Sequence, residues 1–254
     1  MVAVPMRFIL NADDMGHRAE VDAAIRVGLQ QGWLTSVSVM ATGPTFRDAV
    51  SLLAEHPGVS VGVHLDLSEH RPLTPVPSLR AWLTDGRFGP ACRGATAAEL
   101  PDVRDEWSAQ VQAVVDTGLQ PDHLDSHQHL HYQPVLLRAL QSVRRRFGIV
   151  GVRGKAVARP DAGWARDRVQ GVRAAAFRAQ LRAGGARTTR GFGSVTLLRR
   201  LIADRRLRQG VFEVMVHPGE PALTHEIAWL QGGWMASLGG VRGAERVTWR
   251  AVAV

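Results

Sequence analysis

The sequence predicts a single-domain α/β protein whose strands and helices form a (β/α) barrel, regular or distorted. Short apolar or β-branched runs alternate with amphipathic helical patterns almost from end to end, which is typical of parallel βαβ units. Eight such runs in 254 residues match the size of a barrel. A doubly wound open sheet stays an alternative. No Gly-x-Gly-x-x-Gly follows the first run, which argues against its dinucleotide-binding version.

The expected elements follow from residue type and spacing. Apolar and β-branched runs predict strands at Met6–Asn11, Thr35–Met40, Val59–Leu65, His123–Ser126, Ile149–Arg153, Thr188–Phe192, Val211–Val216 and Val247–Val252. Helical spacing predicts helices at Arg18–Gln31, Phe46–Glu55, Val103–Thr117, Pro134–Phe147, Asp167–Ala183, Val195–Arg208 and His225–Leu238. No linker, repeat or low-complexity tract interrupts the chain, so we expect one domain over residues 1–254.

Residues 68–101, rich in proline, glycine and arginine, predict one long loop over the mouth of the barrel. Two aromatic residues within it, Trp82 and Phe88, leave two interpretations open. They form a lid or a sugar platform, or they simply anchor the loop.

Composition indicates an ordinary globular protein, with 45% hydrophobic and 21% charged residues. No apolar run approaches the roughly 20 residues of a transmembrane helix, so we expect no membrane partner. The first residues lack the features of a signal peptide. Cys92 is the only cysteine, which excludes an internal disulfide and a cysteine-based zinc cluster and agrees with a cytoplasmic location.

Positive charge is concentrated in an Arg-rich segment, residues 138–208. This segment carries 19 Arg or Lys against three acids, a local net charge of +16, whereas the rest of the chain has a net charge of −8. Such asymmetry is typical of a surface for nucleic acid or an anionic ligand, although helix faces solvated by arginine give the same pattern. The widely spaced aromatic residues of the segment speak against nucleic acid.

Polar side chains gather where four of the predicted strands end. The carboxyl ends of the strands of a parallel barrel converge on one face, where the βα loops build the active site. Two adjacent carboxylates at the end of a core strand are costly unless a cation or a hydrogen-bond donor meets them. The four clusters are Asn11-Ala12-Asp13-Asp14, His64-Leu65-Asp66, residues 125–131 and His217-Pro218-Gly219.

Each cluster also has a purely structural interpretation. An aspartate of the pair would cap a helix, His64 would be a hydrogen-bonded core histidine, and His-Pro-Gly would end a strand. The third cluster is harder to explain in this way. If it stays extended, alternation puts four side chains on one face, those of Asp125, His127, His129 and His131.

An Asp oxygen with two imidazole nitrogens is an open ligand set for a divalent ion, since it leaves positions for water and substrate. The neighbouring carboxylate of the Asp-Asp pair would then be free to act as a base on the metal-bound water. Hydrolases and two-His-one-carboxylate iron oxygenases share these ligand types, so the residues alone do not distinguish the two classes of enzyme.

Five motifs in chain order carry a resemblance to a known family. They are Phe-Ile-Leu-Asn-Ala-Asp-Asp-Met-Gly (8–16), Gly-Trp-Leu-Thr-Ser-Val-Ser-Val-Met (32–40), Val-Gly-Val-His-Leu (61–65), Pro-Asp-His-Leu-Asp-Ser-His-Gln-His-Leu-His (121–131) and Phe-Glu-Val-Met-Val-His-Pro-Gly (212–219). They resemble the YdjC-like (ChbG-type) carbohydrate deacetylases, which include hopanoid-associated deacetylases. The resemblance implies an irregular β/α barrel similar to the polysaccharide deacetylases, and one divalent metal ion, zinc or magnesium.

The resemblance also implies a role for each matching residue. Three would hold the metal: Asp14, His64 and His127. Asp13 would be the general base, and His217 would protonate the leaving amine, with His129 as the rival for that role. Four would line the substrate pocket: Asp125, His129, His131 and Arg153.

The expected activity is the removal of an N-acetyl or similar N-acyl group from an amino sugar or a glycosylated metabolite. Another metalloenzyme on the same scaffold (an amidase, a phosphoesterase or an Fe(II) oxygenase) and a basic nucleic-acid-binding protein are the alternatives. A homodimer is also compatible with the sequence. The chain departs from the family pattern at residues 156–208 and after Pro218. Both regions would shape the substrate pocket, so an anionic substrate is a further alternative.

Overall fold

The computed structural model describes residues 6–158, 164–238 and 244–252. Its centre is a sheet in the order β7-β6-β3-β2-β1-β9-β8, with β10 also pairing with β1, and these strands all pair in parallel. The strands are β1 (Met6–Met15), β2 (Ser36–Val39), β3 (Ser60–Leu65), β6 (His123–Ser126), β7 (Gly151–Val152), β8 (Gly191–Ser194), β9 (Gly210–Val216) and β10 (Glu245–Arg246).

The two outer strands of this sheet curl toward each other. Gly151 in β7 forms an isolated parallel bridge with Arg187, a few residues before β8. The amide of Val152 donates to the Arg187 carbonyl at 2.9 Å, and the Arg187 amide donates to the Val150 carbonyl at 2.8 Å. The sheet is therefore an irregular, incompletely paired barrel, which confirms the predicted α/β class.

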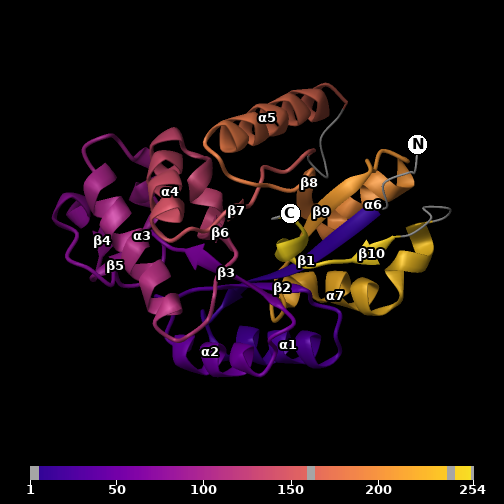
Figure 1. The fold of residues 1–254 in the computed structure, drawn as a ribbon, viewed down its shortest axis with the longest axis horizontal. Coiled ribbons are helices and arrows are strands. Elements are labelled where there is room, and N and C mark those ends of the chain that lie inside the picture. The colour runs from indigo at the N-terminus through magenta and orange to yellow at the C-terminus, as the bar shows by residue number, and fades with distance from the viewer. Residues whose placement is uncertain (1–5, 159–163, 239–243, 253–254) are drawn as a thin grey trace.

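Helices cover the outside of the sheet (Figure 1). Their buried faces follow the helical repeat, as Val21, Ile25 and Leu29 do in α1. The helices are α1 (Ala19–Gln30), α2 (Phe46–Ala54), α3 (Leu100–Val115), α4 (Pro134–Arg146), α5 (Trp164–Ala183), α6 (Val195–Ala203) and α7 (Thr224–Gln231). Within the described residues, no helix combines the length and the apolar character needed to cross a bilayer.

The interior of the barrel is layered by the alternation of side chains in β1. Phe8 and Leu10 join the large core beneath the helices. Ile9 faces the other way and packs with Val211 and Trp249 near the amino ends of the strands. The next inward residue, Asn11, begins a polar layer that continues to the carboxyl ends, where the predicted site lies.

The long connection contains short elements: the 3-10 turns Pro77–Trp82 and Pro90–Gly94 and the hairpin β4 (Leu83–Thr84) and β5 (Arg87–Phe88). Trp82 and Phe88 are only 5% and 4% exposed and belong to the main core. Their burial supports the interpretation that they anchor the connection.

The predicted strand Val247–Val252 is wrong. Residues Trp249–Val252 form a 3-10 turn, and the nearby strand is the short β10 that precedes it. The Trp249 ring stacks on His123 at 4.7 Å, and its amide donates to Ser60 Oγ at 2.9 Å. These contacts turn the chain across the amino end of the barrel, and alternation of apolar residues alone does not reveal such a turn.

Two predicted helices end early for local reasons. The helix expected over Val195–Arg208 ends at Ala203, and Arg205 has a left-handed φ of 51°. The helix expected over His225–Leu238 ends at Gln231, before Gly233 with a φ of 76°, and a 3-10 turn follows. A left-handed residue cannot continue a right-handed helix.

Candidate metal centre

The carboxyl end of β1 directs two adjacent aspartates to the same face. In a regular strand Asp13 and Asp14 would point to opposite sides. Here the register with β2 shifts between Ala12 and Met15, and Asp14 has a φ of 65°. Irregularities of this kind re-aim side chains, and aspartate tolerates the left-handed region better than most residues. Both carboxylates consequently face the end of β9.

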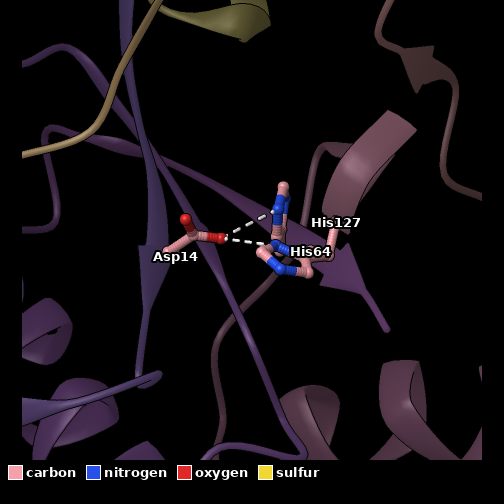
Figure 2. Close-up of side chains that lie close together, drawn as sticks. All are labelled: Asp14, His64 and His127. Carbon is pink, nitrogen blue, oxygen red and sulfur yellow. Dashed lines mark hydrogen bonds and ion pairs between the residues drawn. The ribbon is translucent and has the colours of Figure 1, made fainter. Parts of the chain in front are cut away.

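Three predicted metal ligands converge at this place (Figure 2). Asp14 Oδ1 lies 3.2 Å from His64 Nε2 and 2.9 Å from His127 Nδ1. His64 comes from the end of β3 and His127 from the residue after β6, so three separate strand ends supply the group. One atom from each residue lies within 4.8 Å of the other two, a spacing that could hold an ion.

In both histidines, the ring nitrogen that does not contact Asp14 contacts another carboxylate. His64 Nδ1 lies 2.8 Å from Asp125 Oδ1, and His127 Nε2 lies 2.9 Å from Glu69 Oε2. Metal-binding histidines characteristically donate their second ring N–H to such a partner, which fixes the tautomer and ring orientation. The nitrogens that face Asp14 are thus the ones left to a cation, and this chemistry fits a divalent ion.

The charges of the group are strongly coupled. Burial opposes the charge on Asp14, but hydrogen bonds with His127 and His64 hold its pKa well below the usual range. Burial likewise opposes protonation of His127, yet its bonds to Asp14 and Glu69 raise its pKa to about 9. Protons occupy the positions that a cation would take, so metal binding would release them.

A second group of donors, Asp13, His64 and Asp125, is also close enough to hold an ion. Both of its aspartates accept from Arg153, whose Nη1 lies 2.6 Å from Asp13 Oδ2 and 2.7 Å from Asp125 Oδ2. A guanidinium between two carboxylates repels a further cation. The group around Asp14 is therefore the better candidate.

Arg153 occupies the centre of the polar layer rather than an open wall. It is fully buried, pairs with Asp13 through both terminal nitrogens, and donates from Nε to Glu213 Oε1 at 2.7 Å. Its guanidinium also lies over the Phe192 ring at 5.0 Å. Its role as a substrate-lining residue stays a prediction. The contacts themselves orient Asp13 and Asp125.

His217 follows β9 and reaches the two aspartates from the other side of the site. Its Nε2 lies 3.9 Å from Asp14 Oδ2 and 4.0 Å from Asp13 Oδ2, and its side chain is 30% exposed. Gly219 closes this turn with a φ of 83°, and a Cβ there would come within 2.9 Å of Val21 Cα at the start of α1. The His-Pro-Gly motif thus seats the imidazole at the open face.

The other two histidines of the triple do not join this group. The expectation of an extended segment is wrong, because Gln128 and His129 have φ values of 52° and 55° and the chain turns away after His127. His129 stacks on Tyr132, and burial together with Arg153 lowers its pKa to about 4. His131 is fully buried, with Nδ1 2.6 Å from Ser126 Oγ.

Several residues of the site were missed from the sequence. Glu69 lies in the long connection and contacts His127, while Ser38 and Glu213 belong to the polar layer below the aspartates, together with Asn11 of the first predicted cluster. Glu213 interrupts an apolar strand, a signal that could have placed it inside the barrel. Glu69 carries no such signal, because loop residues have no periodicity.

Known proteins resemble this chain in sequence and fold. The YdjC-like protein family matches residues 7–237. A carbohydrate deacetylase of Geobacillus stearothermophilus is 34% identical over 157 residues, 62% of this chain and 63% of that protein. A carbohydrate deacetylase of Homo sapiens is 32% identical over 154 residues, 57% of this chain and 47% of that protein. In both cases the chain covers less than two thirds of the relative's own length.

Two solved structures resemble the fold over nearly the whole chain. A candidate cellobiose-phosphate cleavage protein of Enterococcus faecalis aligns with a TM-score of 0.73 and 22% identity, covering 98% of this chain and 100% of that one. The lactam utilization protein of Thermus thermophilus aligns with a TM-score of 0.54 and 15% identity, covering 96% of this chain and 100% of that one. At such identities the likeness concerns the fold alone.

Proposed function

This chain belongs to the YdjC-like protein family, and on that premise we propose that it is a metal-dependent hydrolase that removes an N-acetyl or similar N-acyl group from an amino sugar or glycoconjugate. The relatives named carbohydrate deacetylase support the sugar and the reaction. Zinc or magnesium is the expected ion, and the cytoplasm the expected location.

Asp14, His64 and His127 would hold the ion. The observation that carries this assignment is their convergence from three strand ends, with a carboxylate behind each imidazole. A divalent ion in such a site polarises a carbonyl oxygen and lowers the pKa of a bound water to about 7.

Asp13 would be the general base that takes a proton from the attacking water. Arg153 and Asn11 hold its carboxylate: Arg153 Nη2 donates to Oδ1 at 2.7 Å and Asn11 Nδ2 donates to the same oxygen at 2.8 Å. A base fixed in this way keeps one orientation through the reaction, and general acid–base help of this kind contributes about 10²–10⁴-fold.

His217 would deliver the proton to the departing nitrogen, and the structure favours it over His129. His217 is partly exposed and faces Asp13 and Asp14. His129 packs against the rings of Tyr132 and Phe192, and burial together with Arg153 lowers its pKa to about 4. A neutral imidazole in an aromatic pocket is a poor proton donor.

The direct test is acetate release from a panel of N-acetylated sugars, neutral and anionic, under anaerobic conditions. We expect release that a chelator abolishes and that zinc or magnesium restores. Asp14→Asn should lose it, while His56→Gln, a histidine at the other end of the barrel, should retain it. Activity that requires oxygen would point to an oxygenase, and phosphate release without acetate would point to a phosphoesterase.

A further inference from the structure

A cavity lies outside the barrel, away from the candidate metal centre. It has a volume of about 720 Å³ and is lined by one face of α5, the end of α6 and the starts of β8 and β9. Figure 1 shows α5 and α6 on either side of β8. Volumes of about 300–1,000 Å³ are typical of small-molecule sites.

The lining of this arginine cavity is strongly cationic. Among the described residues, seven arginines face it, against one carboxylate, that of Asp167. That carboxylate is already occupied, because Asp167 Oδ2 pairs with Arg200 at 2.7 Å and with Arg206 at 2.9 Å. The part of the lining that the structure describes therefore carries more positive than negative charge.

Arg178 shows this excess of positive charge most clearly. Its Nη1 is buried and has no hydrogen-bond partner among the described residues. Burial lowers its pKa, and repulsion from Arg182, Arg190 and Arg208 lowers it further, so four guanidinium groups lie close together. A buried, unpaired guanidinium donor is costly, and an anion seated among these side chains would remove that cost.

The cavity lies at the opposite ends of the strands from the metal centre. Arg190 directly precedes β8 and Arg208 shortly precedes β9, whereas His217 directly follows β9. A ligand here would not contact the proposed catalytic residues. The apolar part of the lining, which includes Val172, Leu207 and Phe212, provides a wall for a non-polar group next to the charges.

We propose that the arginine cavity binds a small organic molecule that carries two or more phosphate groups, with its organic part on the apolar wall. Guanidinium groups match phosphate oxygens in a bidentate geometry, and several of them around one cavity favour a multiply charged anion. A nucleoside triphosphate has the size, charge and flat apolar base that these walls accommodate.

The test is calorimetric titration of the full chain with ATP, inorganic tripolyphosphate and a single-stranded oligonucleotide. We expect ATP to bind, tripolyphosphate to bind more weakly because it lacks the organic part, and the oligonucleotide not to compete with ATP. Arg178→Gln and Arg208→Gln should each weaken ATP binding about tenfold or more. Arg26→Gln, which removes an exposed charge on α1, should leave it unchanged, and Asp14→Asn should too, so failure of the proposed catalytic function would not affect this result.

Three outcomes would overturn the proposal. The first is no ATP binding at about 1 mM. The second is an equal loss of affinity in Arg26→Gln, which would show a non-specific charge effect. The third is competition by the oligonucleotide, which would assign the surface to nucleic acid. Arg208 lies in an exposed loop, so its variant keeps the test valid if Arg178→Gln does not fold.

Discussion

The polar interior of the barrel and the arginine cavity differ in how many opposite charges contact their arginines. Inside the barrel, Arg153 meets three carboxylates, Asp13, Asp125 and Glu213, and it is fully buried. In the arginine cavity, three other arginines lie near Arg178, and Asp167, the one carboxylate in the described part of the lining, pairs with two arginines. Inside the barrel one guanidinium group contacts three carboxylates, whereas the described lining of the cavity has seven guanidinium groups and one carboxylate.

This difference indicates what each region requires. A buried ion pair is strongly destabilised when one partner is removed, because the other charge is left without compensation. In the cavity, water and salt screen the repulsion between the arginines that are exposed, and the cost is confined to the buried Nη1 of Arg178. Substitutions should therefore damage catalysis and stability in the barrel and ligand affinity in the cavity.

The largest expected effect is on catalysis. Asp13→Asn should lower kcat/KM for acetate release by about 10²–10⁴-fold, because the base is lost, while the remaining amide oxygen can still accept from Arg153 Nη2 and Asn11 Nδ2. Metal content, measured by atomic absorption, should stay at the wild-type level. Wild-type turnover in this variant would refute the assignment of Asp13 as the base.

The next effect is on stability. Arg153→Met leaves three buried carboxylates without their cation and should lower the free energy of unfolding by about 3–5 kcal/mol. Arg208→Met, in the arginine cavity, should change it by at most about 0.5 kcal/mol. Urea denaturation gives the free energy of unfolding of both variants. Similar losses in the two would contradict the difference proposed between the two regions.

A smaller effect concerns the carboxylate behind His127. Glu69→Gln keeps the shape of the side chain but weakens its hydrogen bond with His127 Nε2. The variant should therefore bind the metal about 10–100-fold more weakly. Competition with a fluorescent zinc chelator gives the value. Asp85→Asn, which neutralises an exposed carboxylate in the same connection, serves as the control. Unchanged affinity in Glu69→Gln would mean that Glu69 does not orient His127.

The smallest effect is a pH dependence. Burial, opposed by Arg153, raises the pKa of Glu213 from its ordinary 4.5 to about 7. The folded state then binds more protons than the unfolded chain in this window, so this contribution to stability is present below about pH 4.5 and is lost as the pH rises through about 7. The stability of the wild type relative to Glu213→Gln should fall by about 1–3 kcal/mol between pH 4.5 and 8. A difference that rises with pH would contradict the assignment.

Much of the fold and the core of the site could be predicted from the sequence because both depend on strand patterns. His123–Ser126 was predicted with its observed bounds, and Asp14, His64 and His127 converge because parallel strands end on one face. The placement of His129 and His131 could not be predicted, since two left-handed residues turn the chain there. Glu69 could not be predicted either, because its position depends on how a long connection folds back.

The most direct measurement is anomalous scattering from a crystal soaked in zinc or manganese. The account predicts one peak bound by Asp14, His64 Nε2 and His127 Nδ1, at about 2.0–2.2 Å from each atom. A peak between Asp13 and Asp125, or no peak beside Asp14 under saturating metal, would contradict it.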